Sequence, residues 1–230
     1  MKASTPSLIL YFLACILTIL FDLLGQESLV LYAKSIVVPS IFIYYLTTNN
    51  YKIDIIKAGI FLFSFIGDVF ILMNYNDSEI GSVLSFLIVY VLLIFHLFKG
   101  LKKTKFDRIA ILSLIIVIIT LVILSTTILS LQFEKMKTDF SIIVIYSIVL
   151  STLICISVVN YIVKGTFAFL NLLLMSVFFM FSDIFYVLNG FYLKLSVFSL
   201  IEMATQVFSY FFMVNYFIAN DKSVNKLNNN

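Results

Sequence analysis

Long apolar stretches recur along almost the whole chain, separated by short polar segments. Stretches such as 109–131 do not alternate apolar and polar residues, so they are unlike the strands of a membrane β-barrel. A helix needs about 20 mostly apolar residues to cross the hydrocarbon core of a bilayer. The pattern therefore predicts eight transmembrane helices, at residues 7–24, 29–46, 58–75, 80–98, 109–131, 140–162, 168–189 and 196–219.

The loops between these helices are too short to hold a separate domain. We expect one all-α membrane domain over residues 1–220, followed by a polar, disordered tail over 221–230. A weak internal repeat pairs Gly67-Asp68-Val69-Phe70 with Ser182-Asp183-Ile184-Phe185. The repeat favours two four-helix halves related by an axis along the membrane normal, although Phe-rich helices can also resemble each other by chance.

The composition agrees with a chain whose main solvent is lipid. Hydrophobic residues make up 62% of the chain and charged residues 12%, whereas a soluble domain is about half apolar and a quarter charged. This excludes a soluble enzyme and a disordered chain. The net charge of +3 without a basic stripe excludes a nucleic-acid-binding module. Cys15 and Cys155 lie inside apolar stretches and form no disulfide framework or metal motif.

Basic residues gather in the loops on one side of the predicted bundle, the side that also holds both termini. On that side there are eleven: Lys2, Lys52, Lys57, Lys99, Lys102, Lys103, Lys105, Arg108, Lys164, Lys222 and Lys226. The opposite side has three: Lys135, Lys137 and Lys194. The positive-inside rule therefore predicts that both termini are cytoplasmic. Because the chain is rich in Ile, Phe, Lys and Asn, as in AT-rich bacterial genomes, we expect the cytoplasmic membrane of a bacterium.

Four ionisable residues lie well inside the predicted helices: Lys34, Asp68, Asp183 and Glu202. Such residues cost ~2.5–3.5 kcal/mol each near the middle of a membrane and usually mark a functional site. At ~1.5 Å per residue, all four lie ~8–11 Å from the helix ends on the outer side of the membrane. We call these four residues the polar layer.

Further polar side chains accompany the layer at helical spacing: Ser64 before Asp68, Tyr186 after Asp183, and Gln206 after Glu202. In lipid, such side chains face the interior of the bundle or a wet cavity, or they simply join helices through hydrogen bonds. Three acids and one base cannot all be charged cheaply in a low dielectric. We therefore expect one protonated carboxyl beside one ionised carboxylate, a combination that can act as general acid and general base.

Several functions fit a polar layer of this kind. An intramembrane aspartyl protease is disfavoured, because Phe65-Ile66-Gly67 precedes Asp68 where that class has Gly-x-Gly, and no Pro-Ala-Leu follows. A proton-coupled transporter stays open, although only Pro39 interrupts a predicted helix. A metal site is disfavoured by Lys34 at the same depth and by the position of the one histidine, His96, near the inner end of its helix. A non-enzymatic lipid-binding protein is a further alternative.

A series of short patterns in this chain is similar to those of a known family. They are Tyr32-Ala33-Lys34 with Pro39, Ala58-Gly59, Ser64, Gly67-Asp68, Phe95-His96, Tyr146, Phe181-Ser182-Asp183 and Gln206. In their order and spacing they resemble the YhhN-type lysoplasmalogenase family, which includes multi-span hydrolases of vinyl-ether lipids. The resemblance covers about residues 32–217, and the two aspartate patterns match best.

The resemblance implies a membrane-embedded hydrolase that needs no metal and no cofactor. It would take a lysophospholipid from the bilayer and cleave its vinyl-ether bond to a fatty aldehyde and a glycerophospho-alcohol. Cleavage needs an acid for the alkene and a base for water, much as glycoside hydrolysis uses two carboxyl groups. We expect Asp68 and Asp183 to be the catalytic pair. The supporting or substrate-binding residues are then Lys34, Glu202, Gln206, Ser64 and Tyr186.

Overall fold

A computed structural model describes residues 4–73, 78–101, 108–132 and 138–228 of the chain. Within these ranges the chain forms eight α-helices, one π-helical turn and no strand. In order they are α1 (Thr5–Leu23), α2 (Glu27–Thr48), α3 (Ile55–Leu72), α4 (Ser78–Leu101), α5 (Arg108–Gln132), α6 (Phe140–Lys164), α7 (Phe167–Val187), η1 (Leu188–Tyr192) and α8 (Ser196–Asn228).

All eight helices are long and apolar enough to cross a membrane, with mean hydropathies of 1.5 to 3.0 over their most apolar stretches. Their outer faces carry large apolar side chains such as Ile9, Leu62 and Ile119, each more than half exposed. Helices satisfy their own backbone hydrogen bonds, which is what lipid requires of an exposed segment. The predicted all-α membrane protein with eight spans is therefore confirmed, and the chain is an integral membrane protein.

Helix ends follow local sequence. Asp54 caps α3, because its Oδ1 accepts a hydrogen bond from the backbone N–H of Lys57 at 2.8 Å. Gly165 ends α6 in the left-handed conformation, at φ 57°, which glycine adopts without strain. The predicted bounds agree with the observed ones to within about three residues, except at the end of α8.

Helix α8 runs to Asn228, well past the predicted end at residue 219. It brings Asp221 against Lys57, whose Nζ donates to Asp221 Oδ1 at 2.5 Å. This contact lies in the segment for which the sequence predicts a polar tail, and the domain boundary itself stays a prediction. Lys2, Lys102, Lys103, Lys105, Lys135 and Lys137, which contributed to the predicted orientation, lie outside the described residues.

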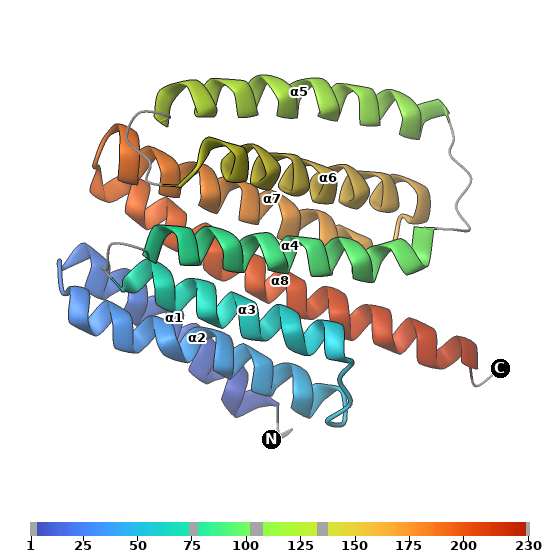
Figure 1. The fold of residues 1–230 in the computed structure, drawn as a ribbon. Coiled ribbons are helices and arrows are strands. Elements are labelled where there is room, and N and C mark those ends of the chain that lie inside the picture. The colour runs from blue at the N-terminus through green and yellow to red at the C-terminus, as the bar shows by residue number, and fades with distance from the viewer. Residues whose placement is uncertain (1–3, 74–77, 102–107, 133–137, 229–230) are drawn as a thin grey trace.

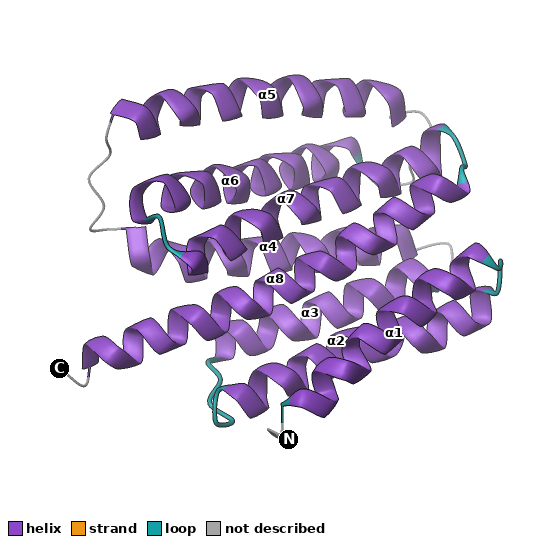
Figure 2. Cartoon of the chain, turned by 180° about the vertical axis from the view of Figure 1, so that it is seen from behind, coloured by secondary structure: helices purple, strands orange, loops and turns teal. Residues whose placement is uncertain are grey.

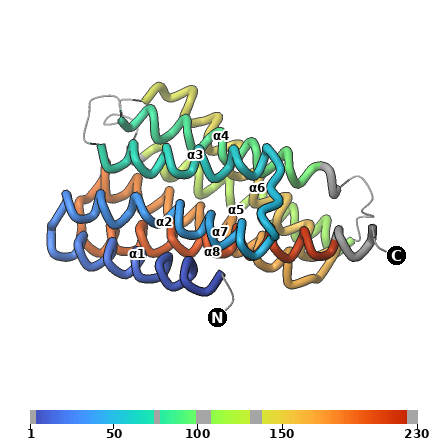
Figure 3. Tube along the Cα trace, turned by 90° about the horizontal axis from the view of Figure 1, so that it is seen from below, coloured from blue at the N-terminus to red at the C-terminus, as the bar shows by residue number. Residues whose placement is uncertain are grey.

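The helices lie side by side, with α5 at one edge of the bundle and α1 to α3 at the other (Figure 1). Seen from behind, α8 runs diagonally between α7 and α1, and it packs against α1, α2 and α7 (Figure 2). Seen from below, the axes of the eight helices are roughly aligned with one another (Figure 3). The pairs α1–α2, α3–α4 and α7–α8 pack closely, whereas α5 contacts mainly α6. In the two predicted halves, the first helix of one, α1, therefore packs closely on its neighbour, whereas the first helix of the other, α5, is held more loosely.

Candidate active site

The carboxyl group of Asp68 lies fully inside the bundle, where α2, α3 and α8 meet. Asp68 is 1% exposed. Its Oδ1 lies 3.8 Å from the Nζ of Lys34 on α2 and accepts a hydrogen bond from the Nε2 of Gln206 on α8 at 2.7 Å. Lys34 and Gln206 are equally buried, at 3%. Three of the residues singled out by the sequence are thus brought together around one oxygen.

Gly67 allows α3 to approach α4 at this level. A Cβ at Gly67 would lie 2.7 Å from the ring of Phe86, closer than real Cβ contacts come. On α4, Gly81 faces the ring of Phe70 in the same manner. The small residue beside Asp68 therefore sets the distance between the two helices, and with it the position of the aspartate.

Buried polar atoms without a hydrogen-bond partner gather around Asp68. Among the described residues, five buried side-chain atoms lack a partner, and four belong to this cluster: Lys34 Nζ, Ser64 Oγ, Asp68 Oδ2 and Gln206 Oε1. An unsatisfied buried polar group costs about 1–3 kcal/mol, so proteins rarely tolerate several in one place. A cluster of donors and acceptors of this kind is suited to bind a polar ligand group or a reacting water.

Asp183 has a different set of partners. Its Oδ2 accepts hydrogen bonds from the hydroxyls of Tyr90 on α4 and Tyr146 on α6, both at 2.8 Å. The two rings meet edge to face, with their centroids 5.4 Å apart. Asp68 and Asp183 share no hydrogen bond, so the expected catalytic pair is not a directly bonded dyad.

A small cavity of about 60 Å³ borders Asp183 and reaches Gln206, the residue that donates to Asp68. The lining includes four residues that the sequence singled out: Asp183, Tyr186, Glu202 and Gln206. Lys34, Ser64 and Asp68 do not line this cavity. Gln206 is the link, because it borders the cavity and also donates to Asp68. The cavity therefore has the carboxyl groups of Asp183 and Glu202 in its wall, and Asp68 lies behind the amide of Gln206.

The members of the polar layer lie near the same end of the bundle. Lys34 follows the start of α2 by seven residues, and Glu202 follows the start of α8 by six. Asp68 and Asp183 each precede the ends of α3 and α7 by four residues. At ~1.5 Å per residue this is a depth of about 9–11 Å for Lys34 and Glu202, as predicted, and about 6 Å for the two aspartates. The aspartates lie nearer their helix ends than predicted because α3 ends earlier than expected, at Leu72, and α7 at Val187.

Three other serines of α7 and α8, and the histidine of α4, do not line the cavity beside Asp183. The hydroxyls of Ser176 and Ser209 donate to carbonyls of their own helices, at 2.9 and 2.6 Å. Ser199 instead donates to Asp22 on α1 at 2.7 Å, near the end of the bundle. His96 packs against the rings of Tyr216 and Phe217, with centroids 6.3 and 5.6 Å away. These rings lie about ten residues along α8 from Gln206, so His96 has no place at the candidate site.

Sequence analysis did not identify Tyr90 as a site residue, and Tyr146 only as part of a family pattern. A tyrosine in a transmembrane helix can lie at the membrane interface, fill the core or bind a polar partner, and hydropathy does not distinguish these roles. Only the packing of α4 and α6 on α7 shows that both hydroxyls reach Asp183.

A comparison with protein-family models matches residues 29–220 to the YhhN family. The chain belongs to the YhhN family. The matched region begins in α2 before Lys34 and ends in α8 after Gln206, so it spans every residue of the candidate site. Comparison with curated proteins and with solved structures finds no match. YhhN membership agrees with the resemblance drawn from the sequence and suggests a lysoplasmalogenase-like membrane protein.

Proposed function

We propose that this YhhN family protein hydrolyses the vinyl-ether bond of lysoplasmalogen-like lysolipids within the membrane. The products would be a fatty aldehyde and a glycerophospho-alcohol. The observation that carries the proposal is the cluster of unsatisfied buried polar atoms at Asp68, next to a cavity that Asp183 and Glu202 line. Family membership supports the same class of reaction.

The reaction adds one water to the substrate, and the proton that the acid gives to the alkene is balanced by the proton that the attacking water releases. An acid protonates the β-carbon of the alkene, which leaves an oxocarbenium ion on the ether carbon. Water attacks this carbon and loses a proton to a base, and the resulting hemiacetal separates into aldehyde and alcohol. Two carboxyl groups on either side of the substrate can supply both proton transfers, as they do in glycoside hydrolysis.

Each aspartate is suited to a different part of this chemistry. Asp183 borders the cavity, and both tyrosine hydroxyls donate to its Oδ2, so Oδ1 is the oxygen that can carry the proton to the alkene. Asp68 has the ammonium of Lys34 at 3.8 Å, which stabilises negative charge on the carboxylate. We assign Asp183 as the acid and Asp68 as the carboxylate that faces the cation.

Lys34, Ser64, Gln206 and Glu202 would support these two groups. Gln206 holds Asp68 through Nε2, and its Oε1 can accept a hydrogen bond from the attacking water. The glycerol ether of a membrane lipid lies just below the headgroup, near the depth of the polar layer. The composition favours the cytoplasmic membrane of a bacterium, and the distribution of basic residues favours both termini in the cytoplasm.

The direct test uses the purified protein in detergent with an alkenyl-lysophospholipid as substrate. We expect aldehyde release that requires the protein, and no release from the matching alkyl-ether lipid, which has no double bond to protonate. Asp139→Asn is a matched control, because Asp139 is exposed and makes no capping hydrogen bond. Wild-type turnover in both Asp68→Asn and Asp183→Asn would overturn the mechanism. Lipid-dependent proton flux in liposomes without aldehyde would favour a transporter instead.

A further inference from the structure

The most loosely held helix of the bundle is α5. Only 11% of its apolar stretch is buried, against 28–44% for the other seven spans. Between α5 and α6 there is a cavity of about 520 Å³, which we call the α5–α6 groove. Ile118, Val122 and Ile148 line it and are 45–60% exposed, so the groove opens to the surrounding lipid.

The walls of the groove are apolar even where the sequence has hydroxyl groups. Thr126 donates to the carbonyl of Val122 at 2.9 Å, and Thr152 donates to that of Ile148 at 2.8 Å. These hydroxyls are already satisfied within their own helices, so the groove offers few polar partners. Its surface is suited to hydrocarbon.

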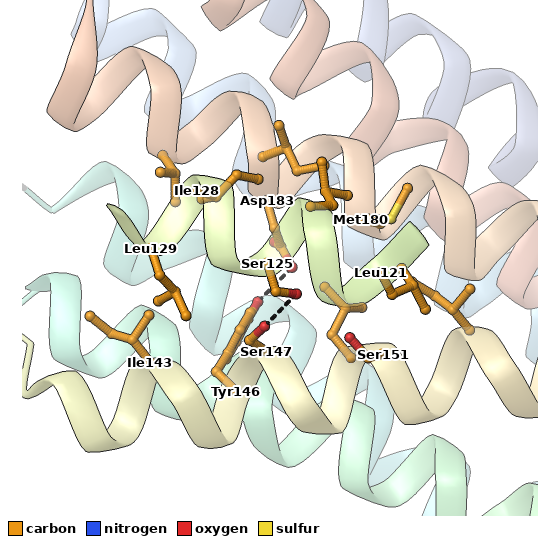
Figure 4. Close-up of a pocket in the computed structure, with 15 residues that line it drawn as sticks. Leu121, Ser125, Ile128, Leu129, Ile143, Tyr146, Ser147, Ser151, Met180 and Asp183 are labelled. Atoms are coloured by element: carbon orange, nitrogen blue, oxygen red, sulfur yellow. Dashed lines mark hydrogen bonds between the residues drawn. The ribbon is translucent and has the colours of Figure 1, made fainter. Parts of the chain in front are cut away.

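The groove continues inward to the candidate site. A second cavity, of about 90 Å³, lies between α5, α6 and α7 and is bordered by both Tyr146 and Asp183 (Figure 4). Five residues line both this cavity and the groove: Leu121, Ser125, Leu129, Ser147 and Ser151. The hydroxyl of Ser147 donates to that of Ser125 at 2.9 Å where the two spaces meet.

Tyr146 and Asp183 also border the cavity that Glu202 and Gln206 line. These two side chains therefore separate a space that opens to the apolar groove from a space whose lining also includes the carboxyl of Glu202 and the amide of Gln206. The boundary between the two has the chemistry of a lysolipid at its ether bond, where a hydrocarbon chain meets glycerol and phosphate.

We propose that the α5–α6 groove is the binding site for the hydrocarbon chain of the lysolipid substrate. The proposal rests on the proposed function for the identity of the lipid. On α5 the groove residues run from Leu129 to Leu114, over about 22 Å, and the part beyond Ser125, where the groove meets the inner cavity, is about 16 Å long. Half of a hydrocarbon core of ~30 Å is ~15 Å, which is the depth that one lipid chain occupies. The groove leads from Asp183 toward the middle of the membrane, as a lipid chain does.

Cys155 offers a way to shorten the groove without touching the acids. It lines the groove but not the inner cavity, two turns further along α6 than Ser147. Cys155→Phe should lower kcat/KM by about tenfold or more for an alkenyl-lysolipid of about 16 carbons, because the end of the chain loses its site. For a chain of about 8 carbons, kcat/KM should stay within about twofold of wild type. Thr120→Phe is the control, since Thr120 is exposed on α5 and lines neither cavity.

If Cys155→Phe does not fold, Ser151→Phe tests the same groove one turn nearer the acids. It should shift the preferred chain to a still shorter length. Equal loss for long and short chains in a folded variant, or no change in the chain-length profile of either variant, would overturn the proposal.

A binding experiment separates this proposal from the reaction itself. The probe is a saturated alkyl-ether lysophospholipid with a diazirine near the end of its chain, which the enzyme should not hydrolyse. We expect saturable photolabelling within residues 114–156, displaced by unlabelled lysolipid. Labelling without aldehyde release in the assay would overturn the reaction but support the groove. Normal aldehyde release with labelling on other helices, unsaturable labelling by bulk lipid, or a cross-linked second copy on α5 would overturn the groove.

Discussion

Two lysine–aspartate pairs with buried lysines lie near opposite ends of the bundle, and they are built differently. Lys57 and Lys34 are each 3% exposed. Lys57 Nζ donates directly to Asp221 at 2.5 Å, and Tyr45 and Asn49 donate to the other oxygen of that carboxylate at 2.9 and 3.0 Å. Lys34 Nζ lies 3.8 Å from Asp68 and makes no hydrogen bond within the described part of the chain.

The difference distinguishes a structural ion pair from a candidate active site. At Asp221 every oxygen has a protein partner, and the pair joins α3 to α8 and α2. At Asp68 the described residues leave one carboxylate oxygen, one ammonium, one hydroxyl and one amide oxygen unsatisfied. Buried charges are costly and need partners. Lys34 and Asp68, which we call the incomplete pair, are therefore suited to bind a ligand or a water. Burial and charge alone would not have separated the two pairs.

The largest expected effect is on catalysis at the incomplete pair and its neighbour. Asp68→Asn and Asp183→Asn should each lower kcat by about 10²–10⁴-fold, the usual contribution of a general acid or base. Asp139→Asn should keep wild-type turnover. Aldehyde release measures the rate, and thermal unfolding in detergent shows whether each variant is folded. Equal loss of activity in all three variants would contradict the assignment.

The two lysines should differ in what their removal costs. Lys57→Met leaves Asp221 without its cation and should lower the free energy of unfolding by about 1–3 kcal/mol, because a bonded, largely buried pair is broken. Lys34→Met also removes a cation beside a buried carboxylate, but it removes an ammonium whose own hydrogen bonds are unsatisfied among the described residues. The loss of unfolding free energy should therefore be smaller than for Lys57→Met, while the rate of aldehyde release should fall. Thermal unfolding and the aldehyde assay measure the two effects. The comparison fails if Lys34→Met is the more destabilising.

The tyrosines at Asp183 should have a smaller effect on the reaction. Tyr90→Phe and Tyr146→Phe each remove one hydrogen bond to Oδ2 and should lower kcat/KM by about fivefold to tenfold, which corresponds to about 1–1.4 kcal/mol. Tyr32→Phe is the control, since Tyr32 is 67% exposed. Steady-state kinetics on the alkenyl-lysolipid measures the change. A control variant as impaired as the other two would remove the argument for a special role of this pair.

The smallest effect distinguishes unsatisfied from satisfied polar groups. Ser64→Ala removes a buried hydroxyl that has no partner among the described residues, and should leave the free energy of unfolding unchanged or up to about 1 kcal/mol higher. Asn49→Ala removes hydrogen bonds to Asp221 and to the carbonyl of Lys52, and should lower it by about 1–2 kcal/mol. Thermal unfolding measures both. A larger loss of stability in Ser64→Ala would show that Ser64 has a structural role.

Positions along the membrane normal could be predicted well from the sequence. Apolar stretches define where each helix begins and ends, and a constant rise per residue then converts sequence position into depth. Lys34, Asp68, Asp183 and Glu202 could therefore be assigned to one level by counting residues from the helix ends. The companions Ser64, Tyr186 and Gln206 followed from helical spacing in the same way.

Lateral arrangement could not be predicted from the sequence, because the outer faces of the helices are all apolar and lipid discriminates little between them. Only tertiary packing showed that Gln206 reaches Asp68, and that Tyr90 and Tyr146 bind Asp183. The same holds for α5, whose sequence is as apolar as its neighbours' but whose packing leaves a groove beside the acids. The sequence determined depth, through hydropathy and helix geometry; the tertiary structure decided which side chains meet, through contacts between residues far apart in the chain.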